Sequence, residues 1–343
     1  MRDRSEVFRG HEYAVFSAAA LAAMLLCVCV GSVRVRAADA LVVIWNSIWN
    51  LPIPEGISKP IIMSVRLPRV LCVALSGATL SLCGAAMQGL LRNPLADGST
   101  MGVSAGASLG AVIALAFGVS VPGLPFAGTM VMAMLFAFLS LVMILTLAYR
   151  LDRSMSTNTI LLIGVIFSMF ATSGISLISA FAGERIKTIM FWTMGSLAGS
   201  TYANALVLLG ALIVCGAVIL SRARELNAFA IGEDNARTIG VNVKRVKLVI
   251  LISVSALIGV CVSVGGTIGF VGLVMPHIAR MIVGPNHHRL LPASLFGGAV
   301  FLMLTDLLAR VIIRPLELPI GVATSLIGSV VFIYIFAKTR AVR

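Results

Sequence analysis

Residues 66–97 read RLPRVLCVALSGATLSLCGAAMQGLLRNPLAD. The apolar part of this stretch is long enough to cross a hydrocarbon layer about 30 Å thick as a helix. Gly, Ala and Ser recur along it, which is typical of helices that approach one another closely inside a membrane. Pro94 cannot continue the helix and favours an extended Asn93. The stretch therefore predicts a closely packed membrane helix that ends in a sharp break.

The composition of the whole chain extends this prediction. The chain has 343 residues, of which 59% are hydrophobic and 11% charged, with a mean hydropathy of +1.05. Soluble domains are about 45–50% apolar and about 25% charged. Long unbroken apolar runs favour helices over the alternating strands of a barrel. We therefore expect an all-α polytopic protein in a lipid bilayer, with about ten spans near 14–33, 66–90, 95–117, 126–149, 157–181, 203–220, 246–265, 268–284, 291–311 and 317–337.

The charge pattern predicts the orientation. Arg2, Arg4 and Arg9 precede the first run, which is longer than a signal-peptide core, so 14–33 is expected to be a retained first helix. Most of the 26 Lys and Arg residues fall in segments that would share a face with the N-terminus. This bias predicts a multi-pass inner-membrane protein with both termini in the cytoplasm. The net charge of +13 then follows from topology and requires no nucleic-acid partner.

Residues 1–343 contain no polar stretch long enough for a soluble domain, so we expect one transmembrane domain. Its six cysteines lie in apolar runs without metal-ligand spacing, and neither a metal site nor a cofactor is predicted. No catalytic cluster is recognisable, so the chain is not expected to be an enzyme. The phosphate-binding pattern GxxxxGK[ST] is absent from the sequence, so any ATP hydrolysis belongs to a separate protein.

Four separated segments carry a resemblance to a known family: RLPR at 66–69, GAAMQGLLRNPLAD at 84–97, GFVGLVMPHIAR at 269–280, and DLLAR with ELPIG at 306–321. From Arg66 to the C-terminus they resemble FecCD permeases, the type II ABC importers of iron-siderophores, heme and cobalamin. The sequence departs from the family pattern at Gly98, where proline is usual. The resemblance implies the type II importer permease fold.

The resemblance also implies partners and cargo. The expected assembly is a homodimer of this permease with two copies of a cytoplasmic ATP-binding subunit and a periplasmic substrate-binding protein. The expected function is translocation of an iron-siderophore or a related chelate, heme or cobalamin, from that binding protein to the cytoplasm. The particular chelate is left open, as is pairing with a paralogous permease instead of a second copy.

Three arginines are candidates for docking the binding protein. In the family, arginines at the positions of Arg66, Arg69 and Arg310 pair with glutamates of that partner, and bidentate guanidinium–carboxylate contacts suit this role. The alternative is that these side chains reach lipid headgroups. Arg310 is also the expected partner of Asp306, one helical turn earlier.

The segment 222–247 resembles the family's cytoplasmic coupling segment, which contacts the ATPase. The candidate coupling residues are Gly232, Glu233, Ala236 and Gly240, and short helices lying along the membrane surface would fit the pattern. The alternative is a solvated connecting loop.

Asn93 and Leu95 match family positions that narrow the cytoplasmic exit of the pathway; the alternative is a simple interhelical turn. Thr172 and Ser173 are candidates for a second constriction, although small polar residues also serve helix packing.

The competing function is an ion-coupled secondary transporter of a small solute. Such proteins place ionisable residues near mid-membrane. The middles of the predicted spans carry almost none, which favours the ABC permease. Dependence of uptake on an ATPase, rather than on a proton gradient, separates the two.

Overall fold

The computed structural model describes residues 7–31, 35–53, 59–120, 127–313 and 315–341, and Arg2 and Arg4 lie outside this part of the chain. The described residues form helices and contain no strand, which confirms the all-α prediction. The α-helices are α1 Gly10–Cys29, α2 Ala37–Ile48, α3 Leu67–Leu91, α4 Val103–Phe117, α5 Ala127–Leu151, α6 Thr157–Phe181, α7 Ile186–Thr193, α8 Tyr202–Ser221, α9 Ala223–Ala230, α10 Glu233–Thr238, α11 Val243–Gly265, α12 Val271–Val283, α13 His287–Val311 and α14 Ile320–Ala341. Shorter helical turns are Ile61–Arg66, Gly98–Met101 and Gly183–Arg185.

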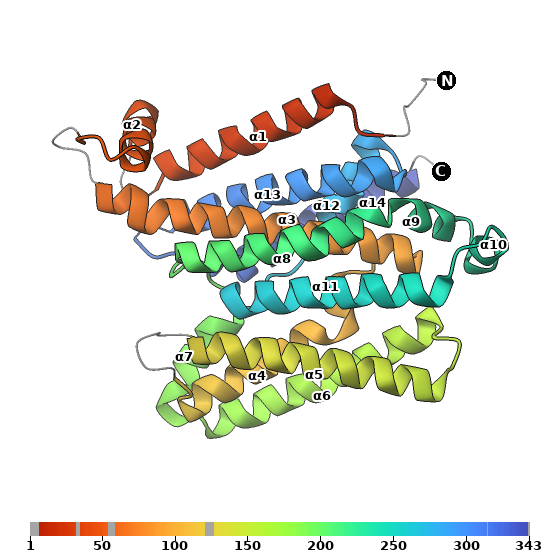
Figure 1. Ribbon diagram of the computed structural model, residues 1–343. Coiled ribbons are helices and arrows are strands. Elements are labelled where there is room, and N and C mark those ends of the chain that lie inside the picture. The colour runs from red at the N-terminus through yellow and green to blue at the C-terminus, as the bar shows by residue number, and fades with distance from the viewer. Residues whose placement is uncertain (1–6, 32–34, 54–58, 121–126, 314, 342–343) are drawn as a thin grey trace.

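The long helices run roughly parallel or antiparallel in one bundle (Figure 1). Both ends of the described chain lie at one end of the bundle, here called the termini side, together with α9 and α10. The opposite end, the far side, carries α2 and α7.

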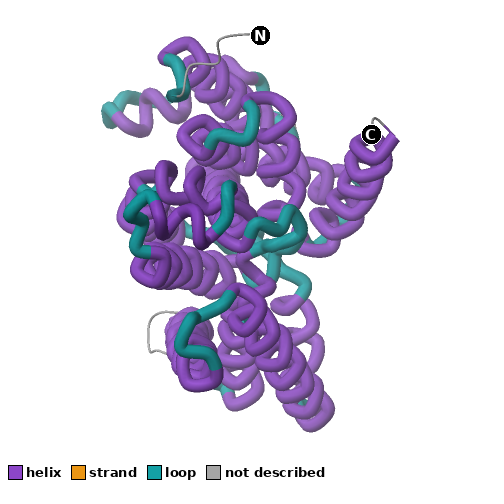
Figure 2. The backbone as a smooth tube through the Cα atoms, turned by 90° about the vertical axis from the view of Figure 1, so that its right-hand side faces the viewer, coloured by secondary structure: helices purple, strands orange, loops and turns teal. Residues whose placement is uncertain are grey.

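Helix α11 joins two groups of helices. It packs against α3 and α8 on one side and against α4 and α5 on the other. Viewed from the side in Figure 2, the helix that carries the C-terminus stands at the edge of the molecule. Helices α3 and α11 are largely buried, whereas at most 28% of the apolar stretch of α1, α5, α6 or α8 is buried within the bundle. Such exposed apolar surface suits contact with lipid or with another membrane subunit.

Seven helices in the described part of the chain are long and apolar enough to cross a membrane, among them the continuous stretch Ile61–Leu91. The shorter apolar helices α4 and α12, and the stretch Ile320–Ile335 of α14, fall within the other predicted spans. Together they account for the ten predicted spans. Helix α2 was not predicted, and α4 begins at Val103 rather than near residue 95.

Helices α4 and α12 are short because the chain enters each of them inside the bundle. A Cβ atom on Gly272, at the start of α12, would come within 2.8 Å of the Leu80 carbonyl in the middle of α3. Irregular backbone at this depth is tolerated only where protein surrounds it. The predicted spans 95–117 and 268–284 therefore each begin with a short segment that is not α-helical.

The small residues of α3 have the predicted packing role. A Cβ on Gly84 would lie 1.8 Å from the Gly272 carbonyl of α12, and one on Gly77 would lie 2.3 Å from the Gly298 carbonyl of α13. Real Cβ contacts are never so short, so both crossings require glycine. Backbone approach of this kind supplies the dispersion energy that holds membrane helices together.

Candidate functional site

The segment between α8 and α11 forms two short helices on the termini side, as predicted. Gly232 and Gly240 adopt φ values of 115° and 91°, which a side chain would strain, and they turn the chain at either end of α10. Ala236 is fully buried on the inner side of α10. These three predicted coupling residues therefore shape and anchor α10.

Glu233 anchors the same helix through charge. Its carboxylate lies 2.8 Å from the ammonium group of Lys247 on α11 and accepts a hydrogen bond of 3.2 Å from the Thr157 hydroxyl. Lys247 is only 1% exposed and also donates to the Met155 carbonyl at 3.1 Å. The pair ties α10 to α11 and to the α5–α6 turn.

The side chains that α10 presents outward are different ones. Ile231 and Ile239 are 60% and 63% exposed at its two ends. Asp234 and Arg237 form an exposed ion pair at 3.2 Å on its outer face. The predicted coupling segment includes these four residues, but none of them was among its candidate residues, although isolated isoleucines in a polar segment are a usable signal for a contact surface.

The break after α3 is built as a capped turn. Arg92 takes a left-handed conformation with φ 49°, and the Asn93 side chain accepts a hydrogen bond of 2.9 Å from the Leu95 amide. Leu95 is 49% exposed. The chain then turns inward, so that Asp97 lies against Gly272 and near Leu80. The sequence predicted the break at Pro94 but not this inward turn, which places the acid inside the bundle.

Thr172 and Ser173 lie on the exposed face of α6, beside the exposed Met169 and Phe170. The Ser173 hydroxyl donates to the Met169 carbonyl at 2.9 Å. The intrahelical bond lets this hydroxyl occupy apolar surroundings. The two residues are on a different element from Asn93 and Leu95.

The three predicted docking arginines lie on the far side but are buried. Arg69 pairs with Asp306 at 2.9 Å and with Glu317 at 2.7 Å. Arg310 lies 3.0 Å from Asp306, which confirms that predicted pair.

Arg66 and Arg310 also stabilise the end of α1. Arg66 donates to the Val28 carbonyl at 2.8 Å and to the Cys29 carbonyl at 3.2 Å, and Arg310 donates to the Cys27 carbonyl at 3.2 Å. Cations at a helix C-terminus satisfy its free carbonyls and its negative dipole end. The guanidinium groups of all three arginines therefore contact other groups of the same chain. Among the charged partners of these arginines, Glu317 is the exposed one, with 45% of its side chain accessible.

In the described part of the chain no group of three or more His, Cys, Asp or Glu side chains could hold a metal ion. The six cysteines are free thiols, four of them buried.

These features, a bundle of apolar helices with a pair of short surface helices held against its termini side, are those of a polytopic membrane protein. The chain matches the FecCD transport family over residues 19–338 and belongs to that family. The family assignment made on the four motifs is therefore confirmed.

Two relatives are named for different cargoes. The cobalamin import system permease protein BtuC of Halobacterium salinarum is 36% identical over 89% of this chain and 80% of its own length. The hemin transport system permease protein HmuU of Yersinia pestis is 34% identical over 89% of this chain and 91% of its own length. A solved metal-chelate type ABC transporter in an inward-facing conformation has a TM-score of 0.81 at 29% identity, covering 95% of this chain and 98% of the solved one. The chain is thus a permease of the ABC importer type, and similarity alone does not select its cargo.

Proposed function

We propose that this chain forms the translocation pathway of an ATP-driven importer, as a homodimer in the inner membrane with both termini in the cytoplasm. The cargo class is a large metal chelate, an iron-siderophore, heme or cobalamin. Membership of the FecCD family supports the importer class, and the cargoes named for the two relatives support the chelate class.

The observation that carries the proposal is the bracing of α10. A surface helix that only connected α9 to α11 would have no need of a buried ion pair. The Glu233–Lys247 contact joins α10 to the bundle interior, while Ile231 and Ile239 face outward. This arrangement suits a helix that receives force from an ATP-binding subunit and passes it to α11 and the α5–α6 turn.

The far side is the proposed docking face for a periplasmic binding protein. An acidic partner would reach Arg69 by displacing Glu317, the exposed member of the cluster. Arg66 and Arg310 would contribute attraction from beneath the surface, since their charge acts over several ångströms even when they contact α1. Docking would therefore be coupled to the packing of α1, α3 and α13.

Asn93 and Leu95 are the proposed constriction at the termini side, and Thr172 and Ser173 the proposed second level on α6. The exposed Leu95 side chain and the exposed face of α6 leave both sets available to a pathway between two subunits. Their intrachain hydrogen bonds leave little free polarity to hold a chelate tightly.

One observation favours the ion-coupled alternative. The half-buried carboxylate of Asp97 lies inside the bundle, where coupling acids of secondary transporters are found. The experiment that separates the two functions is uptake after replacement of Asp97 by Asn, which retains the oxygen that accepts from the Gly98 amide. An ATP-driven permease keeps its uptake and an unchanged pH profile, whereas a proton-coupled carrier loses its dependence on the gradient.

A further inference from the structure

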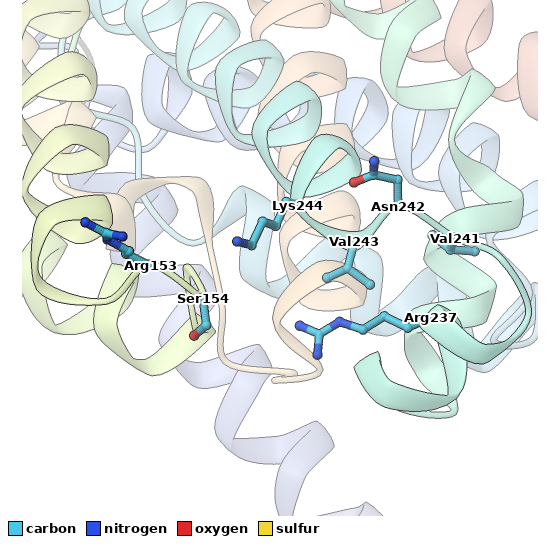
Figure 3. Close-up of a pocket in the computed structure, with 7 residues that line it drawn as sticks. All are labelled: Arg153, Ser154, Arg237, Val241, Asn242, Val243 and Lys244. Atoms are coloured by element: carbon cyan, nitrogen blue, oxygen red, sulfur yellow. The ribbon is translucent and has the colours of Figure 1, made fainter.

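A basic pocket of about 510 Å³ lies on the termini side, between the α5–α6 turn and the start of α11. Figure 3 shows the lining side chains, which come from three segments of the chain. The full lining is Arg153, Ser154, Arg237, Val241, Asn242, Val243 and Lys244. Three cations from separate segments around one opening favour an anionic occupant.

The neighbouring acids leave two of these cations available. Asp152 accepts hydrogen bonds from Ser154 and Ser156, which hold the pKa of its carboxyl well below its usual range, and its oxygens are thereby occupied. Asp234 pairs with Arg237. Among the residues that the structure describes, neither Arg153 nor Lys244 takes part in an ion pair.

An apolar groove of about 350 Å³ lies between α5 and α11, nearer the middle of the bundle than the basic pocket. Its walls include Phe138 and Val142 on α5 and Ile252 and Ala256 on α11. Ser255 contributes the one hydroxyl group of the lining. A groove of this composition suits a hydrocarbon chain.

The pocket and the groove lie on one face of the helix pair. On α11, the exposed residues Lys244, Leu248, Ile252 and Ala256 follow one another at intervals of four, which places them in one stripe. Lys244 and Ile252 are eight residues apart, a rise of about 12 Å.

Helix α5 repeats the pattern. Phe138, Val142, Leu145 and Tyr149 follow at intervals of three or four and lead to Arg153 in the turn. A ligand could therefore reach from the basic pocket into the apolar groove without crossing another helix.

We infer that this face binds an anionic phospholipid, with the phosphate headgroup in the pocket and an acyl chain in the groove. Charge complementarity selects the headgroup, because juxtamembrane Lys and Arg attract anionic lipids. The groove selects a lipid over an acidic protein surface, since it lies at a depth that a soluble partner does not reach. The lipid would brace the α5–α6 turn against α11, the two elements that Lys247 also joins.

The test is native mass spectrometry of the purified full chain, titrated with phosphatidylglycerol and with phosphatidylcholine of identical acyl chains. We expect at least about tenfold tighter retention of phosphatidylglycerol, as two cations of the pocket would provide. The double variant Arg153→Gln/Lys244→Gln should lose that preference. The control Lys187→Gln/Arg224→Gln, which removes the same charge from exposed positions elsewhere, should keep it.

A second variant, Ala256→Phe, fills the groove at an exposed position. It should weaken phosphatidylglycerol retention several-fold but leave binding of the soluble probe glycerol 3-phosphate unchanged. Equal retention of both lipids by the unchanged chain, or equal behaviour of the two double variants, overturns the proposal. So does glycerol 3-phosphate binding as tightly as the lipid, which would indicate a free-phosphate site. Loss of the ATP-binding subunit with unaltered lipid retention in Arg153→Gln/Lys244→Gln would instead make the pocket a protein interface.

Discussion

Lys247 of α11 and Glu233 of α10 form an ion pair at 2.8 Å, with the lysine almost fully buried. A buried ammonium group is stable only when it is paired and hydrogen-bonded. Here the Met155 carbonyl supplies a further acceptor at 3.1 Å. Three segments on the termini side are therefore joined at one point.

The first prediction concerns this pair. Lys247→Met leaves a largely buried carboxylate unpaired, which we expect to cost roughly 2–3 kcal/mol and to lower the melting temperature of the purified chain. The double variant Lys247→Met/Glu233→Gln should recover most of the loss, because neither charge is then left alone. Complexes of either variant with the ATP-binding subunit should still hydrolyse ATP but should import less chelate than the complex of the unchanged chain.

The exposed pair Asp234–Arg237 provides the matched control on the same helix. The variant Asp234→Asn/Arg237→Gln should melt as the unchanged chain does, since exposed ion pairs contribute little. A melting temperature that falls equally in the control and in Lys247→Met would contradict the bracing role.

The second prediction concerns the helix crossings. Gly84→Ala should destabilise the chain by roughly 1–3 kcal/mol, because its Cβ would overlap the backbone carbonyl of Gly272. Gly210→Ala on α8 is the control, as nothing lies within 4 Å of the added atom. Thermal unfolding in detergent measures both. Equal melting temperatures for the two variants would show that α3 and α12 are not in close contact.

Much of the bundle was predictable because the length and hydropathy of an apolar run identify a membrane helix. The run from residue 66 to the break at Pro94 predicted α3 nearly to the residue, and its small residues predicted the close crossings. Helix α2 was missed because Ala37–Ile48 is too short to be read as a span. The inward turn at Asp97 was missed because the depth of a residue in the bundle depends on which helices surround the break. The spacing of residues in the sequence does not contain this information.

The candidate site was predictable in position but less so in geometry. The sequence located α10 and its two glycines, yet nothing in it marked Lys247 as a buried partner of Glu233. Likewise Arg66, Arg69 and Arg310 were expected at the outer surface, whereas each is buried and engaged within the chain. A charge pattern gives the side of the membrane, but tertiary contacts decide whether a charge faces outward.

The third prediction concerns docking on the far side. The change Arg69→Glu would remove one of the two arginine partners of the buried Asp306 and add a second carboxylate beside it. A loss of docking in that variant could then arise from unfolding. Glu317→Gln avoids this, because the removed charge is exposed and competes with a partner carboxylate for Arg69. We expect binding-protein affinity to rise by about threefold or more at low salt.

Glu184→Gln, another exposed acid on the far side, is the control and should shift affinity less. The measurement is the affinity of the binding protein for each permease variant in nanodiscs, determined by surface plasmon resonance. A weaker or unchanged affinity in Glu317→Gln would leave Arg69 with a structural role only.

The fourth prediction concerns the pathway. Ser173→Phe places a large ring on an exposed face of α6 and should leave the melting temperature unchanged while reducing uptake at least about tenfold. Val214→Phe, at an exposed apolar position of α8, should affect neither quantity. Uptake in Ser173→Phe equal to that in Val214→Phe would remove α6 from the pathway.

The source of the driving force is tested most directly in proteoliposomes loaded with ATP and containing the purified chain, with or without its ATP-binding subunit. In the presence of the binding protein and a chelate, we expect accumulation against the gradient only when the ATP-binding subunit is included, and no effect of a protonophore. Uphill accumulation by this chain alone, abolished by the protonophore, would contradict an ATP-driven permease.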